Sequence, residues 1–123
     1  MPVKPLNASS LSLLLERIEY ARHGEVRSIT PFSPTSIEIR FSVQDKARGY
    51  DWIDVAFRID GVTDAKLVGD NLFPSLDMSE GITAEITPHT AALAIGRYEG
   101  RAEEAPLYIA GSSMGYEELP FSG

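Results

Sequence analysis

The sequence predicts an α+β fold in which one N-terminal helix packs on a strongly twisted, mainly antiparallel meander of six to seven strands. Residues 37–43 and 53–59 alternate apolar and polar side chains, and each run therefore has one apolar face for a core. The connectors between strand-length runs are too short for crossover helices, which favours antiparallel pairing. A sheet of this size must twist, and it could curl toward a half-barrel.

The helix is expected near the N-terminus. Its apolar residues follow the spacing of one helical face and are Leu11, Leu14, Leu15, Ile18 and Ala21. Ser9 or Ser10 can cap its start, because a hydroxyl oxygen accepts a hydrogen bond from a free backbone N–H of the first turn. We expect the helix to end near Arg22, with Gly24 as its C-terminal stop.

Residues 25–30 form the first expected strand, closed by Pro31, and the two alternating runs follow it. Their charges predict their register. Pairing Glu38 with Arg58, or Arg40 with Asp54, sets opposite charges across the two strands, and both registers keep the apolar faces together. Either register leaves a loop over residues 44–51.

Four further strand-length runs are separated by turn residues and cover residues 65–68, 82–87, 91–98 and 107–110. Asp60-Gly61 and Pro88-His89-Thr90 supply two of the turns. Residues 99–106 form the most polar loop, and residues 116–119 could add a last edge strand. No internal repeat is present, so we expect residues 1–123 to form a single α+β domain.

Composition restricts the classes of function. The 43% hydrophobic and 24% charged residues are those of an ordinary globular protein, and the absence of cysteine excludes disulfides and thiolate metal sites. The longest apolar stretches have about five residues, whereas a membrane span needs about twenty. No cleavable signal pattern follows the early leucines, and we therefore expect a cytoplasmic protein that does not bind membranes.

The net charge of −7 is unevenly distributed. Residues 1–61 carry eight basic and eight acidic residues, whereas residues 62–123 carry three basic and ten acidic residues. Nucleic-acid binding needs a basic surface that neutralises phosphates, so this distribution argues against it. An acidic C-terminal half favours a basic protein partner, although acidity for solubility alone is the simpler alternative.

No catalytic constellation is complete. Residues 111–115 match the G-x-S-x-G nucleophile pattern around Ser113, but the pattern requires a following helix with a histidine downstream, and neither is expected here. His23 and His89 are the only imidazoles, and they lack the close spacing of metal ligands. We therefore expect a protein that is not an enzyme and has no metal or cofactor.

Two pairs of adjacent acids are candidate contacts for a partner, Glu103-Glu104 and Glu117-Glu118. Neighbouring side chains in an extended segment point to opposite faces, so neither pair can share a proton as a catalytic dyad does. Solvated acids are the simpler interpretation. As a functional site, each pair could bind a partner's lysine or arginine.

Tyr50 and Trp52 are the candidate aromatic contacts. Tyrosine and tryptophan are frequent anchors in protein interfaces and stacking surfaces for sugars, although Trp52 could instead cover the end of the core. This leaves an alternative function open, a small-molecule or carbohydrate-binding module on the concave sheet face near Trp52. Exposed edge strands leave both a monomer and a homodimer open.

The segments at residues 48–52, 61–67, 77–81 and 116–118, with the sequences RGYDW, GVTDAKL, DMSEG and YEE, resemble a type of small bacterial protein associated with immunity proteins encoded beside polymorphic toxins. The resemblance supplies no catalytic motif and assigns no residue. It implies a non-enzymatic interaction module that neutralises a toxin domain, and the acidic C-terminal half implies that this domain is basic.

Overall fold

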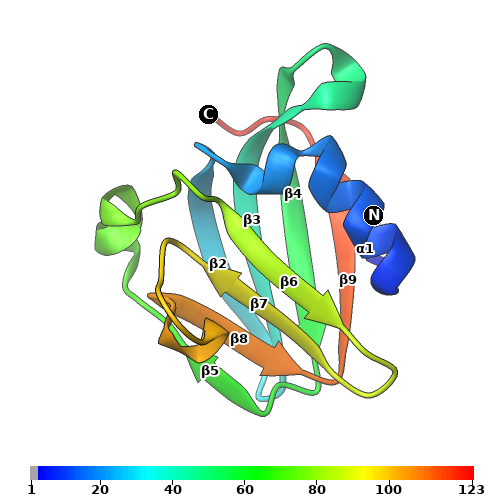
Figure 1. Cartoon of the computed structure of the whole chain (residues 1–123), viewed down its shortest axis with the longest axis vertical. Helices are drawn as coiled ribbons and strands as arrows, with labels where there is room; N and C mark the ends of the chain where they lie inside the picture. The colour runs from blue at the N-terminus through cyan, green and yellow to red at the C-terminus, as the bar shows by residue number, and fades with distance from the viewer. Residues whose placement is uncertain (1–2) are drawn as a thin grey trace.

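The computed structural model describes residues 3–123 and has two antiparallel sheets with one α-helix (Figure 1). Sheet A contains, in spatial order, β1 (Lys4–Pro5), β9 (Ser113–Leu119), β4 (Asp51–Asp60), β3 (Ser36–Asp45) and β2 (Glu25–Ser33). Sheet B contains β5 (Asp64–Lys66), β8 (Leu107–Gly111), β7 (Ala91–Ile95) and β6 (Ile82–Ile86). The helix is α1 (Ala8–Arg17), and the short 3₁₀ segments are η1 (Glu19–Ala21), η2 (Lys46–Arg48), η3 (Asp70–Ser75) and η4 (Ala102–Glu104).

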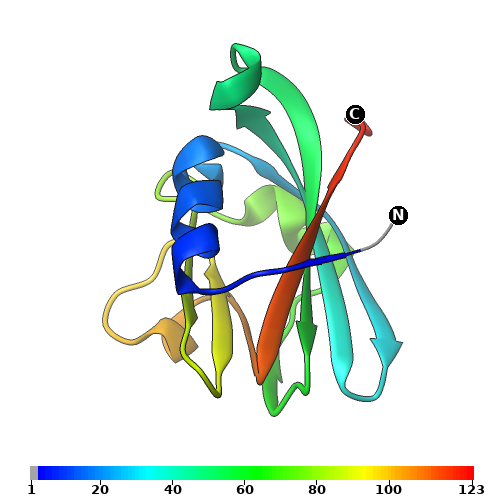
Figure 2. The same cartoon turned by 90° about the vertical axis from the view of Figure 1, so that its right-hand side faces the viewer.

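The molecule has two layers, because α1 and sheet B lie side by side on one face of sheet A (Figures 1 and 2). Their facing side chains form the main core. Its members include Ile39, Phe41, Val55, Phe57 and Ile59 of sheet A, Ile82, Leu93, Ile95, Leu107 and Ile109 of sheet B, and Leu11, Leu14 and Leu15 of α1. The rings of Phe41 and Phe57 meet edge to face at 5.9 Å in this core.

The α+β class with antiparallel strands is confirmed, but nine strands in two sheets replace the expected six or seven in one meander. Neither sheet closes on itself. The chain leaves β4 through Gly61, whose φ of +62° is left-handed, and sheet B is completed before β9 returns to pair with β4. Ser112 alone joins β8 to β9, so the chain crosses between the sheets in a single residue.

The predicted register of the central pair is confirmed. Glu38 lies opposite Arg58, and Arg40 reaches diagonally to Asp54, with Nε 2.5 Å from Oδ2. Both proposed charge pairings therefore occur within one register. The strands end at Asp45 and resume at Asp51, so the expected loop is also present.

The start of the helix differs from the prediction, because Asn7 is the N-cap in place of Ser9 or Ser10. The Asn7 side chain accepts a hydrogen bond from the Ser10 backbone N–H at 2.8 Å. The Ser10 hydroxyl accepts one from the Asn7 N–H at 2.9 Å, which completes a reciprocal capping box. Ser10 therefore contributes to the cap from inside the first turn.

The end of the helix also differs, because α1 stops at Arg17 and Gly24 is not its C-terminal stop. Residues 19–21 and His23 have positive φ values, so the chain reverses through non-glycine residues. Ile18 and Ala21 remain buried as predicted. Gly24 instead allows close packing on β3, since a Cβ there would lie 2.8 Å from the Ser42 carbonyl oxygen.

Two strand assignments change in detail. β2 continues through Pro31 to Ser33. A proline is possible there because β2 is an edge strand, and the side without a neighbouring strand needs no backbone N–H for pairing. The last strand is not at the edge, since β9 lies between β4 and β1. Within residues 3–123, no helix has the length and apolar character needed to span a membrane.

We predict that Gly81→Ala destabilises the fold more than Gly49→Ala. Both glycines have left-handed φ values, of +72° and +64°, which cost a non-glycine residue about 1–2 kcal/mol. A Cβ at Gly81 would also collide with the carbonyl oxygen of Tyr20, whereas one at Gly49 meets nothing within 4 Å. Urea unfolding should therefore show a clearly larger loss for Gly81→Ala, and equal losses would contradict this role of Gly81.

Candidate functional site

The six candidate contact residues lie in three separate places. Tyr50 and Trp52 are at the β3–β4 hairpin, and Glu117 and Glu118 are in β9. Glu103 and Glu104 are in the 3₁₀ segment η4, so the expected extended conformation is wrong for this pair. As expected, the two glutamates of β9 point to opposite faces, because Glu118 meets α1 while its neighbour lies on the outer face of sheet A. The acids of the C-terminal half therefore do not form one surface.

Glu118 belongs to a cluster of two arginines and two carboxylates at the end of α1. Asp45 is fully buried, and Arg17 donates to both of its oxygens, from Nε and from an Nη, each at 2.9 Å. Arg17 also donates to Glu118. Arg48 lies 3.2 Å from Asp45 and 3.3 Å from Glu118. The cluster connects the helix, the hairpin and β9.

The buried Asp45 stays ionised. Burial alone would raise the pKa of its carboxyl, but the hydrogen bonds from Arg17 and from the Ala47 backbone N–H outweigh burial and hold that pKa below its usual range. The same contact raises the pKa of the Arg17 guanidinium. The charges of this cluster are matched within the protein, which favours a structural role.

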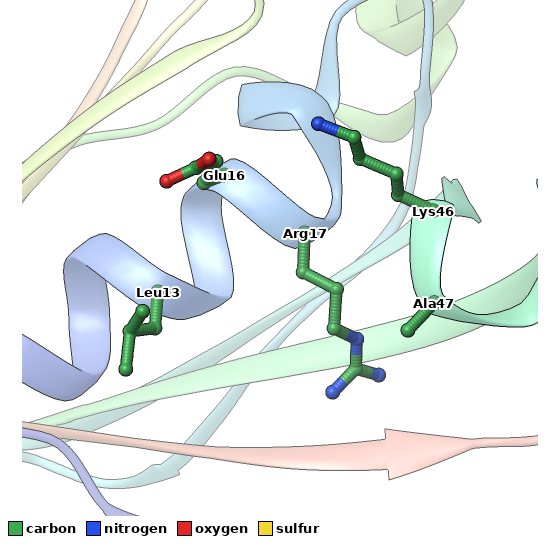
Figure 3. A pocket seen from close by; sticks show the side chains of 5 residues that line it. All are labelled: Leu13, Glu16, Arg17, Lys46 and Ala47. Carbon is green, nitrogen blue, oxygen red and sulfur yellow. The ribbon is translucent and has the colours of Figure 1, made fainter.

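A groove with a volume of about 360 Å³ lies beside this cluster, between α1 and η2 (Figure 3). Its lining residues are Leu13, Glu16, Arg17, Lys46 and Ala47. Leu13 is 71% exposed, and Arg17 points away from the helix toward the strands (Figure 3). Leu13 and Ala47 supply the apolar part of the lining, and Glu16, Arg17 and Lys46 supply charged groups.

The outer face of sheet A has a second buried charge, Asp54, which is also fully inaccessible. Its carboxylate accepts hydrogen bonds from Arg40 Nε at 2.5 Å and from the Ser42 hydroxyl at 2.6 Å. Arg27 Nε donates to the same hydroxyl at 2.6 Å. Burial would raise the Asp54 pKa, but the hydrogen bonds from Ser122, Ser42 and Arg40 lower it. These groups form a polar chain across β2, β3 and β4.

Residues 120–123 follow β9 and lie on the side of sheet A that faces away from α1 (Figure 2), where the Ser122 N–H donates to Asp54 Oδ1 at 3.4 Å. The Phe121 ring lies 5.6 Å from the Trp52 ring and 5.7 Å from the Arg27 guanidinium carbon. Trp52 therefore contacts the chain's own C-terminal segment, a contact that its sequence position did not predict.

Glu38 lies on the same face and has an unfavourable environment for its charge. Burial raises the pKa of its carboxyl, and the nearby Glu117 carboxylate raises it further, while Arg58 and Arg40 only partly compensate.

The outer face of sheet B and the loops beside it carry five acids of the C-terminal half. We define the acidic face as Asp64, Glu85, Glu99, Glu103 and Glu104, which are all exposed. Glu103 pairs with Arg101 at 3.2 Å, and Glu104 accepts from the Arg101 backbone N–H. Within residues 3–123, the other three acids have no ion-pair partner.

Small side chains form the surface between these acids. Ala92, Ala94 and Ala110 lie on the outer face of β7 and β8. Ala92 and Ala110 are half-buried, whereas Ala94 is buried with Tyr108 and Ala105 in a small second cluster. Thr83 of β6 shares a hydrogen bond of 2.9 Å with the Tyr98 hydroxyl. Burial raises the Tyr108 pKa, as do Glu103 and Asp64, so its hydroxyl stays protonated. This part of the surface therefore carries small side chains and tyrosine hydroxyls, and the acids of the acidic face surround it.

Two further hollows, of about 450 and 320 Å³, follow the free edge of β2 where it faces η3. Arg27, Asp70 and Phe73 line both of them. The walls are otherwise largely apolar and come from β2 and from the segment that precedes β6.

The residues of the G-x-S-x-G pattern lie at the end of β8 and the start of β9, and His89 lies in a turn. Ser113 opens β9 opposite Asp60, and no helix follows it in the described chain. A Cβ at Gly115 would lie 2.9 Å from the Lys4 carbonyl oxygen, so the glycine allows β1 to approach. His89 is exposed in a turn. No group of three or more histidine, aspartate or glutamate residues in positions 3–123 could hold a metal ion.

We predict that Arg17→Met destabilises the protein by about 2–3 kcal/mol at neutral pH, because it removes the main partner of a buried carboxylate. Lys46→Met is the matched control in the same groove and should change the free energy of unfolding by less than about 0.5 kcal/mol. Urea unfolding measures both. Equal effects would show that Asp45 does not depend on Arg17.

The same variant should change the acid sensitivity. The lowered Asp45 pKa contributes stability that is present above about pH 4, the ordinary aspartate pKa, and is lost as pH falls through the folded-state pKa. Without Arg17 that pKa rises, so the stability that remains should be lost at a higher pH than in the wild type.

Glu38→Gln is expected to stabilise the protein at pH 7 by less than about 1 kcal/mol. Because the folded-state pKa of Glu38 is raised, this carboxyl contributes stability that is fully present below about pH 4.3, the ordinary glutamate pKa, and is lost as pH rises through the folded-state pKa. Glutamine does not ionise, so the variant does not lose this stability at pH 7. Glu38→Gln should gain less in a Glu117→Gln background than in the wild type, because the repulsion between the two carboxylates is then already absent. Additive gains in urea unfolding would exclude repulsion between the two carboxylates.

Comparisons of the chain with protein-family models, with curated proteins and with solved structures found no match. The resemblance to immunity proteins therefore stays a prediction from the sequence segments that suggested it. Function has to be inferred from the charges and surfaces described above.

Proposed function

We propose that this protein is a non-enzymatic interaction module that binds a basic protein partner through the acidic face of sheet B. The main support is the group of three exposed carboxylates, Asp64, Glu85 and Glu99, that have no cationic partner within residues 3–123. The buried acids Asp45 and Asp54, in contrast, are paired with arginines of the protein itself, so they are not available to a partner.

The charge balance of the two layers supports the same face. Residues 62–112, which include all of sheet B, contain eight acidic and three basic residues and carry a net charge of −5. Five of the eight acids belong to the acidic face, and the other three lie between β5 and β6. The two remaining charges of the acidic half belong to Glu117 and Glu118 in sheet A. Glu118 is bound by Arg17 and Arg48, so the excess acid available to a partner lies mainly in the second layer.

The surface between the acids suits a protein partner. The half-buried Ala92 and Ala110 leave a low plateau, onto which a partner's long basic side chains can extend toward the acidic rim. The tyrosine hydroxyls beside the plateau add hydrogen-bonding groups. Opposite charges across such an interface speed association and select partners, and salt weakens the effect.

The partner would be a basic toxin domain if the resemblance to immunity proteins holds. Neutralisation would then consist of covering the toxin's basic surface, and it requires no reaction by this chain. The cytoplasm is the compartment in which we propose that the two proteins meet.

The alternative of a small-molecule or carbohydrate site near Trp52 has one supporting observation, because this side chain is 39% exposed. Phe121 lies against the same ring, which reduces the surface open to a sugar. A flat response of Trp52 fluorescence to a library of sugars and metabolites would remove this alternative.

The test of the acidic face is to capture binding partners from cells of the source organism, with the full-length protein as bait. We expect a specific basic protein to bind the wild type and to be lost from the variant Glu85→Lys/Glu99→Lys. The control variant Glu16→Lys/Asp51→Lys makes the same change in net charge at exposed acids outside sheet B and should retain the partner. The dissociation constants of the two variants should differ by tenfold or more, measured with the purified partner.

Salt provides the second readout. At about 0.5 M NaCl the screening length falls to roughly 4 Å, so the wild-type complex should weaken strongly. A partner that binds both variants equally, or whose affinity does not change with salt, would contradict the acidic face as its binding surface.

A further inference from the structure

We propose that the outer face of sheet A around Trp52 is a peptide-binding site, that residues 120–123 of the chain itself occupy it, and that an extended segment of a partner protein with an aromatic side chain displaces them. This inference does not depend on the acidic face, which belongs to the other sheet.

The contacts of residues 120–123 are those by which proteins hold extended peptides. One aromatic side chain, Phe121, lies between Trp52 and Arg27. The backbone on either side of it is also bound: Arg40 donates to the Pro120 carbonyl at 3.3 Å, and the Ser122 N–H donates to Asp54 Oδ1 at 3.4 Å. Backbone contacts of this kind accept many sequences, and the ring supplies the anchor.

The receptor groups hold one another in place without the tail. Asp54 keeps its hydrogen bonds from Arg40 and Ser42 at 2.5 and 2.6 Å. Arg27 is fixed by Ser42 at 2.6 Å and by Glu25 at 3.3 Å. Departure of residues 120–123 therefore leaves Asp54 with two partners and leaves no buried charge unpaired. A site whose geometry exists before the ligand arrives loses little entropy on binding.

The backbone of residues 120–123 makes longer hydrogen bonds than the groups beneath it make with one another, and the Ser122 side chain adds a hydrogen bond to Asp54. The two backbone hydrogen bonds are 3.3 and 3.4 Å long, near the limit for such bonds. Phe121 is 43% exposed and Trp52 is 39% exposed, so their contact removes only part of each ring from water. The β9 ladder has already ended at Leu119, and no strand pairing holds the residues that follow.

These contacts specify the ligand chemistry. An aromatic ring is required, because it must stack near Trp52 and face the Arg27 cation. The residue after the ring must supply a backbone N–H to Asp54, which excludes proline there. The residue before the ring needs only a carbonyl for Arg40, so the proline at position 120 is allowed.

The test uses full-length protein and the synthetic peptide Leu-Pro-Phe-Ser-Gly, with fluorescence of Trp52, the only tryptophan, as the signal. A tethered segment acts at an effective concentration of millimolar order, so the wild type should bind free peptide weakly. In Phe121→Ala the tethered segment loses its anchor, and the peptide should bind at least tenfold more tightly.

Two peptides and one further variant serve as controls. Replacing Phe by Ala, or Ser by Pro, in the peptide should abolish binding to Phe121→Ala. Adding Arg27→Met to that variant should also abolish it. Equal binding of the peptide to the wild type and to Phe121→Ala, or no binding to either, would overturn the proposal.

Hydrogen exchange tests the proposal on the wild-type protein, without any substitution. A displaceable tail predicts that the Ser122 amide exchanges orders of magnitude faster than the amides of β4. Equal protection would mean that the tail is a fixed part of the fold and would overturn the proposal. A wild-type dimer that Phe121→Ala abolishes would assign the site to the tail of a second copy and would overturn the assignment to another protein.

Discussion

The pairing of β3 with β4 is the constraint on which the rest of the structure depends. These are the two longest strands of the described chain, and each sends every second side chain into the core. A slip of one residue would move that whole set into solvent. The same register brings Arg40 to Asp54 and sets Glu38 opposite Arg58, so the arrangement of charge on the outer face follows from the packing of the inner one.

Each end of this pair anchors a different part of the molecule. At the hairpin end, Asp45 binds Arg17 of the helix and Trp52 meets the C-terminal residues. At the other end, Asp60 and Gly61 direct the chain into sheet B, and the Ser112 N–H donates to the Asp60 carbonyl as the chain returns. The buried acids of sheet A, Asp45 and Asp54, are thus paired within the protein, whereas Asp64, Glu85 and Glu99 on the side of sheet B have no ion pair within residues 3–123.

The alternation of residues 37–43 and 53–59 was enough to predict the central strands, their register and their loop, because these depend on local pattern and on charges directly across the pair. The division into two sheets was not predictable in this way, since β4 finds its second neighbour more than fifty residues later in the chain. The end of the helix was not predictable, because Gly24 is the residue type that commonly ends a helix. The chain turns earlier instead, at Glu19, Tyr20 and Ala21, which all have positive φ values.

The candidate site was predicted only in part. Trp52 was identified from its residue type, but its neighbour Phe121 lies far away in the sequence. Asp54 was missed because an acid on the polar face of an amphipathic strand is expected to be solvated, and Asp45 was missed because it falls in the expected loop over residues 44–51. Only the approach of α1 and of residues 120–123 buries them. Adjacent glutamates suggested an acidic patch, yet Glu118 is bound by two arginines.

The late position of β9 has a consequence for synthesis of the chain. During translation β4 has one unpaired edge while all of sheet B, residues 64–111, emerges from the ribosome. An apolar strand with an open edge can associate with other chains. The nascent protein therefore passes through a stage in which its central hairpin is exposed to aggregation, and a chaperone or rapid docking of sheet B would shorten that stage.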